Sequence, residues 1–197
     1  MGMKACAKIR FGTDALEGRK ILVQGVGHVG EYLVEYLRKE RAEVFIADIS
    51  DDTVRKVVQK YGAKGIELNK VYQQDMDIYA PCALGGTIND DTLAELKCGI
   101  IAGAANNQLG IENAHGQALL DKGILYAPDF AINAGGVINC FSEVKDLSSE
   151  WAMGKAEDIY HTIHDIVARS ERERIPSHVI AMRMAEEKIN NGRSNTK

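Results

Sequence analysis

Three glycines spaced as G-x-G-x-x-G, at Gly25, Gly27 and Gly30, carry the clearest chemical meaning in the chain. They follow a predicted strand at residues 21–24 and open a segment of helical periodicity that ends at Leu37. In a strand–turn–helix unit the first glycine permits the turn, the second admits a pyrophosphate, and the third lets helix pack on strand. The alternative is that the three glycines are needed only for steric reasons in a tight turn. The context favours a dinucleotide-binding loop, with the helix N-terminus toward the phosphates, formed by Gly25, Val26, Gly27, His28, Val29 and Gly30.

Asp48 ends the next apolar run, residues 44–47, about twenty residues after the glycines. A carboxylate at this position can accept hydrogen bonds from an adenosine ribose. A 2′-phosphate there would meet a negative charge, and residues 49–52 add acids rather than bases. The sequence therefore favours NAD over NADP. The alternative is that Asp48, or Asp51, only caps the helix that follows.

The pattern of apolar residues predicts the elements that position these groups. Short apolar runs recur without polar alternation, at residues 21–23, 44–47, 78–80, 100–102 and 124–127. Such strands are typical of a parallel sheet covered by helices on both faces, and helical spacing lies between them. The sequence predicts an α/β fold with a doubly wound, mostly parallel Rossmann sheet in residues 1–147. A helical C-terminal tail, residues 148–197, would pack on it, with Ser148 or Ser149 as the first cap.

Composition and charge exclude several classes of protein. The chain has 197 residues, of which 45% are hydrophobic and 26% charged, as in soluble globular domains. The net charge of -4 and the scattered basic residues predict neither nucleic-acid nor membrane partners. The cysteines, Cys6, Cys82, Cys98 and Cys140, form no C-x-x-C pair. We therefore expect reduced thiols, no metal site and a cytoplasmic location.

Three further strings of small and amide residues stand where strands should end, at residues 80–86, 103–108 and 132–137. In open α/β sheets the ligand crevice lies outside the carboxyl ends of the strands, so these strings could line a cofactor cleft. Each string alone is equally consistent with a turn, because Gly and Asn are common turn residues.

With these strings in order, the chain resembles the C-terminal, cofactor-binding half of the leucine, valine and phenylalanine dehydrogenases, and most closely that of the leucine enzymes. The similarity runs through residues 12–18, 24–27, 80–86, 107–109, 126–129, 132–139 and 175–176. That family oxidatively deaminates branched-chain or aromatic L-amino acids to 2-oxo acids and passes a hydride to NAD. The resemblance implies that residues 25–30 hold the pyrophosphate and that Asp48 holds the ribose.

The resemblance also assigns residues near the reacting groups. It implies that Cys82, Ala83 and Asn106 line the nicotinamide side, and that Asn107 lies near the reacting amino acid. It places Val137 and Cys140 in the pocket for the aliphatic side chain. The chain departs from the family pattern at two of these positions. His28 stands where Asn is common, and Cys140 replaces a branched aliphatic residue, which keeps the pocket apolar.

Amino-acid oxidation needs a base, a group that polarises the developing carbonyl, and a charge for the carboxylate. In the family two lysines and an aspartate of an N-terminal domain supply them, and this sequence has no matching glycine-lysine segment. We therefore expect a half enzyme without catalytic residues of its own, which binds its substrate only with the other half and could form a homo-oligomer. One alternative is a non-catalytic NAD(H)-sensing module. Another is a purely structural α/β domain, but the retained cofactor and pocket strings argue against this second alternative.

Overall fold

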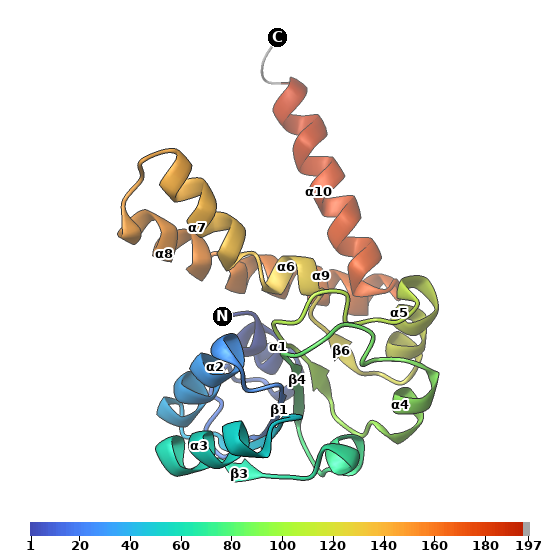
Figure 1. The fold of residues 1–197 in the computed structure, drawn as a ribbon. Helices are drawn as coiled ribbons and strands as arrows, with labels where there is room; N and C mark the ends of the chain where they lie inside the picture. Colours follow the sequence, from blue (N-terminus) through green and yellow to red (C-terminus); the bar gives the residue numbers. More distant parts are fainter. Residues whose placement is uncertain (195–197) are drawn as a thin grey trace.

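A computed structural model describes residues 1–194, and these residues form one sheet of six parallel strands in the order β3-β2-β1-β4-β5-β6 (Figure 1). The strands are β1 (Lys20–Gln24), β2 (Glu43–Ala47), β3 (Lys64–Gly65), β4 (Ile78–Pro81), β5 (Ile100–Ile101) and β6 (Leu125–Tyr126). The α/β, doubly wound fold is thus confirmed, and the sheet is parallel throughout. β1 pairs with β2 on one side and with β4 on the other. The strand order therefore reverses direction between β1 and β4. Ligand crevices in such sheets open at this reversal.

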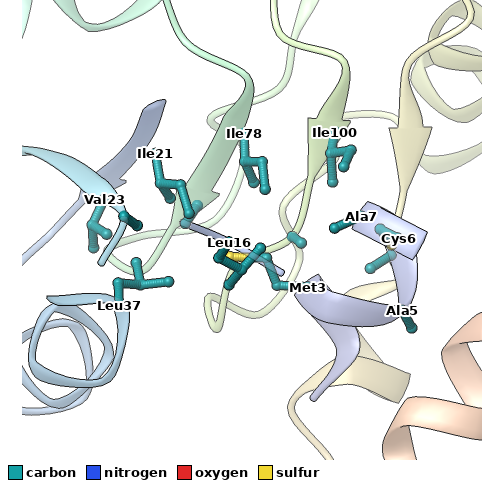
Figure 2. Close-up of a cluster of buried hydrophobic side chains, with 14 of the residues drawn as sticks. Met3, Ala5, Cys6, Ala7, Leu16, Ile21, Val23, Leu37, Ile78 and Ile100 are labelled. Carbon is teal, nitrogen blue, oxygen red and sulfur yellow. The ribbon is translucent and has the colours of Figure 1, made fainter. Parts of the chain in front are cut away.

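Helices cover both faces of the sheet, as continuous apolar strands require. Those that precede β6 are α1 (Gly2–Phe11), α2 (His28–Lys39), α3 (Asp51–Tyr61), the 3-10 turn η1 (Leu68–Gln73), α4 (Asp90–Glu95) and α5 (Glu112–Asp121). Alternate strand residues enter two separate clusters. Ile21, Ile78 and Ile100 face α1 and α2, as Figure 2 shows for the cluster around Met3. Their neighbours in the strands enter the second cluster, against η1, α4 and α5.

The last part of the described chain is helical. Its elements are α6 (Asp129–Ile132), α7 (Gly135–Val144), α8 (Ser149–Glu157), α9 (Ile159–Glu173) and α10 (Ser177–Ser194). Ser148 caps α8 by accepting the Trp151 amide at 3.2 Å, which decides between the two predicted caps. α9 packs along α1 and shares its core cluster, whereas α10 extends away from the sheet (Figure 1). The division of the chain at residue 147 stays a prediction.

α7 and α8 lie side by side as a helical hairpin at the edge of the molecule (Figure 1). The rings of Phe141 and Trp151 join them, with centroids 5.8 Å apart. None of the helices in residues 1–194 is both long and apolar enough to cross a membrane.

Candidate functional site

The three glycines of the loop after β1 have different surroundings. Gly25 has a φ of +92°, and a Cβ there would lie 2.6 Å from the Cβ of Ala83. A Cβ on Gly30 would lie 1.9 Å from the carbonyl oxygen of Gly25. The protein's own packing therefore requires both glycines. At Gly27, by contrast, no atom of the described chain beyond its neighbours would lie within 4 Å of a Cβ. The space beside Gly27 is therefore open and could admit a ligand.

The N-terminus of α2 offers its amides to this opening. Gly27 is the N-cap residue, and no side chain of the described residues caps the helix. Uncapped first-turn amides lack intrahelical partners and attract anions. The acid of this turn, Glu31, is paired with Lys60 at 2.7 Å and also accepts a bond from Tyr61. These hydrogen bonds lower the pKa of Glu31 and offset its charge, so the helix end can accept a phosphate.

Asp48 holds the glycine loop from the end of β2. Its Oδ2 accepts the Val26 amide at 2.8 Å, and its Oδ1 accepts the Ser50 amide at 3.0 Å. Each carboxylate oxygen retains acceptor capacity for a ligand hydroxyl. Ser50, rather than Asp48 or Asp51, caps α3 by accepting the Thr53 amide at 3.3 Å. The alternative prediction, that one of these aspartates only caps the helix, is therefore wrong.

The loop after β4 packs directly on the glycine loop. The Cys82 amide donates to the carbonyl of Gln24 at 2.7 Å, and Ala83 fills the space beside Gly25. Burial raises the pKa of the Cys82 thiol to about 11, so this thiol stays neutral near pH 7. Cys82 and Ala83 thus lie beside the glycine loop. Their expected place on the nicotinamide side of a cofactor stays a prediction.

The loop after β5 carries the two asparagines. The side chain of Asn106 accepts a hydrogen bond from the Asn133 side chain. Asn107 has a φ of +52°, a conformation that Asn tolerates better than most residues, and its carbonyl accepts the Gly86 amide at 2.7 Å. The buried amide of Gln108 braces the turn from inside by donating to the carbonyls of residues 103 and 105.

An open cleft of about 820 Å³ lies between the sheet, with α1 and α2, and the helices α6 to α9. On one side it is lined by the start of α1, by α2 and by the loop after β5; on the other by α6 to α9. It brings together four of the predicted residues, namely Val29, Asn106, Val137 and Cys140. Asn107 instead lines a neighbouring hollow of about 560 Å³, which Asn106 also borders.

Several cleft residues escaped the sequence analysis. Leu33, Ala156 and Ile159 line the wall, but in the sequence they form part of ordinary helical stripes. Asn133 lies within one of the strings already noted, and its amide could have been singled out there. Among the lining residues that the structure describes, none is Asp, Glu, Lys, Arg or His.

Comparison with known proteins gives this geometry a family. Residues 46–193 match the sequence profile of the family described as Glutamate/Leucine/Phenylalanine/Valine dehydrogenase. The chain belongs to this dehydrogenase family. It is 50% identical over 188 residues to leucine dehydrogenase of Bacillus subtilis, covering 95% of this chain and 51% of the relative. It is 40% identical to L-tryptophan dehydrogenase of Nostoc punctiforme, covering 98% of this chain and 55% of that relative.

Solved structures agree with this membership of the dehydrogenase family. The crystal structure of L-tryptophan dehydrogenase from Nostoc punctiforme matches with a TM-score of 0.95 at 40% identity, over 98% of this chain and 58% of that one. The hetero-hexameric glutamate dehydrogenase from Thermus thermophilus has a TM-score of 0.72 at 20% identity, covers 96% and 51% of the two chains, and shows the fold alone. The chain thus spans about half the length of the curated relatives it matches.

In this family member both departures from the expected pattern lie at exposed positions. His28 begins α2, and its ring meets that of Tyr32 edge-on, with centroids 5.1 Å apart. Cys140 has an exposed thiol on the cleft face of α7. Neither residue is held by the core, so both are free to meet a ligand.

Proposed function

We propose that this chain is the NAD-binding half of an amino-acid dehydrogenase that oxidises branched-chain L-amino acids, leucine first among them, to 2-oxo acids. The observation that carries the proposal is the continuity of the site. The cleft includes Val29, in the first turn of α2, and extends to the apolar wall around Val137 and Cys140. A dinucleotide bound at the glycine loop would therefore reach the pocket for the substrate side chain.

The residues present fit a nicotinamide dinucleotide. Gly27 leaves open space at the turn, and the amides of α2 stand uncapped beside it. Asp48 has acceptor capacity left for ribose hydroxyls. Asn106 and Asn133 would orient the nicotinamide end by their amides, and the apolar walls would exclude water. When bound, the nicotinamide ring supplies the hydride acceptor.

Asp48 should make the chain prefer NADH to NADPH. A carboxylate that faces a 2′-phosphate costs about 1 to 3 kcal/mol, which corresponds to about 5- to 150-fold in affinity. In Asp48→Asn, which keeps an acceptor for the Val26 amide but removes the charge, the two affinities should approach each other. Asp51→Asn is the matched control, because it removes a neighbouring acid that is not bonded to the loop. Fluorescence titration measures both ratios. Equal affinities in the wild type, unchanged in Asp48→Asn, would show that Asp48 does not meet the ribose.

The acid–base groups of the proposed reaction must come from outside the cleft lining. The described lining has no ionisable side chain apart from the Cys140 thiol. The ammonium of an amino acid needs a base, and its carboxylate needs a cationic partner. We therefore propose that another protein segment, equivalent to the rest of the longer relatives, closes over the cleft and supplies them.

Cys140 should set the size of the substrate side chain. In the enzyme completed with its other half, Cys140→Phe is expected to lower kcat/KM for leucine about tenfold more than for valine, since one methylene in such a pocket is worth about 1 to 3 kcal/mol. Val144→Phe is the control, because Val144 lies on the same helix, is 82% exposed and is outside the cleft lining. An unaltered ratio in Cys140→Phe would remove Cys140 from the pocket.

The second candidate is a non-catalytic NAD(H)-sensing module. It would use the same loop and Asp48, but it would have no use for a pocket wall that fits aliphatic side chains. Self-association is a further proposal for either function, supported by the exposed apolar side chains of Met153 on α8 and Met182 on α10. Activity after reconstitution separates the two candidates, because a sensing module would remain inactive.

A further inference from the structure

The loops after β4 and β5 run side by side beyond the carboxyl ends of their strands. Ile88 and Leu109 form a parallel bridge outside the named strands. The Ile88 amide donates to the Gln108 carbonyl at 3.0 Å, and the Gly110 amide donates back to the Ile88 carbonyl at 2.8 Å. This small ladder fixes the segment that carries Asn107 and its neighbour Asn106.

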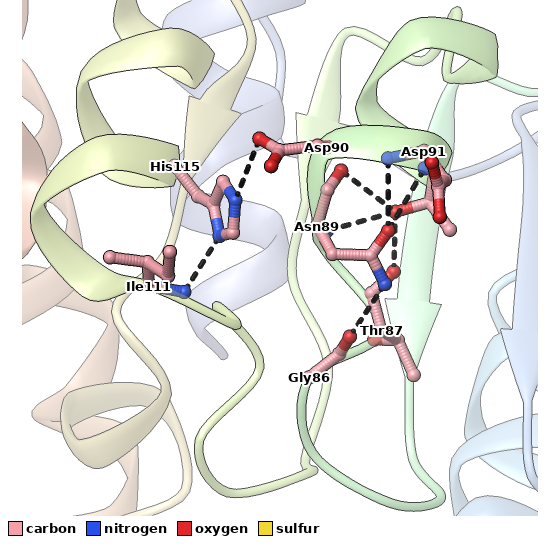
Figure 3. Close-up of polar contacts among 8 residues, drawn as sticks. Gly86, Thr87, Asn89, Asp90, Asp91, Ile111 and His115 are labelled. Atoms are coloured by element: carbon pink, nitrogen blue, oxygen red, sulfur yellow. Dashed lines mark hydrogen bonds and ion pairs between the residues drawn. The ribbon is translucent and has the colours of Figure 1, made fainter.

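A buried histidine holds the far end of this ladder. The Ile111 amide donates to Nδ1 of His115 at 2.8 Å, and Nε2 lies 3.2 Å from Oδ1 of Asp90 (Figure 3). The His115 side chain is only 4% exposed. Because Nδ1 accepts an amide hydrogen, the ring proton resides on Nε2 and is donated to Asp90. The imidazole thus joins the loop after β5 to the start of α4.

The α4 end of this contact is itself fixed. The side-chain oxygen of Asn89 caps α4 by accepting hydrogen bonds from the backbone amides of Asp91 and Thr92, both at 3.1 Å. The side-chain nitrogen of Asn89 donates to the Gly86 carbonyl at 3.0 Å (Figure 3). Gly86 in turn donates to the carbonyl of Asn107. The two loops and the first turn of α4 therefore form one connected unit through Gly86 and Asn89, and His115 holds this unit at Ile111.

We propose that His115 is a positioning residue: by holding Ile111 it keeps Asn106 at its place in the cleft, so binding of the nicotinamide half of the cofactor depends on it. This inference rests on the proposed function. The Ile111 bond is the effective one, because the buried imidazole shields it from water. The bond to Asp90 contributes little, since the Asp90 side chain is 92% exposed.

The test compares NADH with ADP, which would use only the glycine loop and Asp48. His115→Leu removes the acceptor and is expected to weaken NADH binding about fivefold, the effect of about one hydrogen bond, while ADP affinity stays unchanged. His115→Asn places an oxygen near the position of Nδ1 and should restore NADH affinity. The side-chain amide of His115→Gln lies near the Nε2 position instead, so this variant should not restore NADH affinity. Asp90→Ala is the matched control and should leave both affinities unchanged.

Each outcome has a distinct meaning. Equal losses of NADH and ADP affinity in His115→Leu, or no difference between the Asn and Gln variants, would overturn the positioning role. If the wild type binds neither NADH nor ADP, the proposed function fails instead. Should His115→Leu not fold, the Asn and Gln variants decide alone, because both retain a polar side chain at this position. Thermal unfolding of all four variants shows whether folding is matched.

Discussion

Mixed with L-leucine and NAD, this chain alone is expected to form NADH no faster than buffer does. The described cleft lining contains no Asp, Glu, Lys, Arg or His side chain that could take the proton of the substrate ammonium. A missing acid–base group costs a factor of about 10² to 10⁴ in rate. An unclosed cleft also loses the positioning of substrate against cofactor, which is worth about 7 to 11 kcal/mol of the barrier.

Adding the remaining half of a leucine dehydrogenase should produce turnover, followed as NADH absorbance. The control mixture contains the same half with the Gly27→Val chain and should stay inactive, which shows that the dinucleotide binds to this chain. Turnover by the lone wild-type chain would contradict the proposal that the acid–base groups come from another segment.

Gly27→Val should strongly weaken dinucleotide binding without unfolding the protein. Gly27 has φ and ψ of -66° and -161°, which other residues also adopt, and no described atom crowds its Cβ position. The valine side chain would instead fill the space that a pyrophosphate needs. Loss of two phosphate–amide hydrogen bonds, at about 1.5 kcal/mol each, weakens binding about 150-fold. Calorimetric titration measures the affinity, and thermal unfolding should give the wild-type midpoint.

Gly30→Ala is the informative contrast. Alanine in a helix is normally about 1 kcal/mol better than glycine, but here its Cβ would lie 1.9 Å from the Gly25 carbonyl oxygen. This variant should therefore unfold at a lower temperature. If Gly27→Val bound NADH as tightly as the wild type, the glycine loop would not be the pyrophosphate site.

The strands that the sequence predicted are those that contain a continuous run of apolar side chains. β3 could not be found this way, because Lys64 and Gly65 are both exposed. Its pairing with β2 depends on backbone hydrogen bonds, such as that from the Ile66 amide to the Ile46 carbonyl, and side-chain pattern does not encode these. The sequence predicted a helical tail but not the boundary within it, where Asp158 ends α8 and begins α9.

The candidate site was predictable where a motif is local and hidden where it depends on packing. The glycine spacing and Asp48 are visible in the sequence, but the bond from the Val26 amide to Asp48 spans 22 positions. The role of His115 is hidden for the same reason. Its partner Asp90 lies 25 positions away, and a lone histidine in a helix carries no sequence signal.

Calorimetric titration of the wild-type chain with NADH tests the central claim most directly. We predict saturable binding at one site per chain, displaced by ADP and lost in Gly27→Val. The absence of binding, or binding that Gly27→Val leaves unchanged, would contradict the assignment of the glycine loop and its cleft to a dinucleotide.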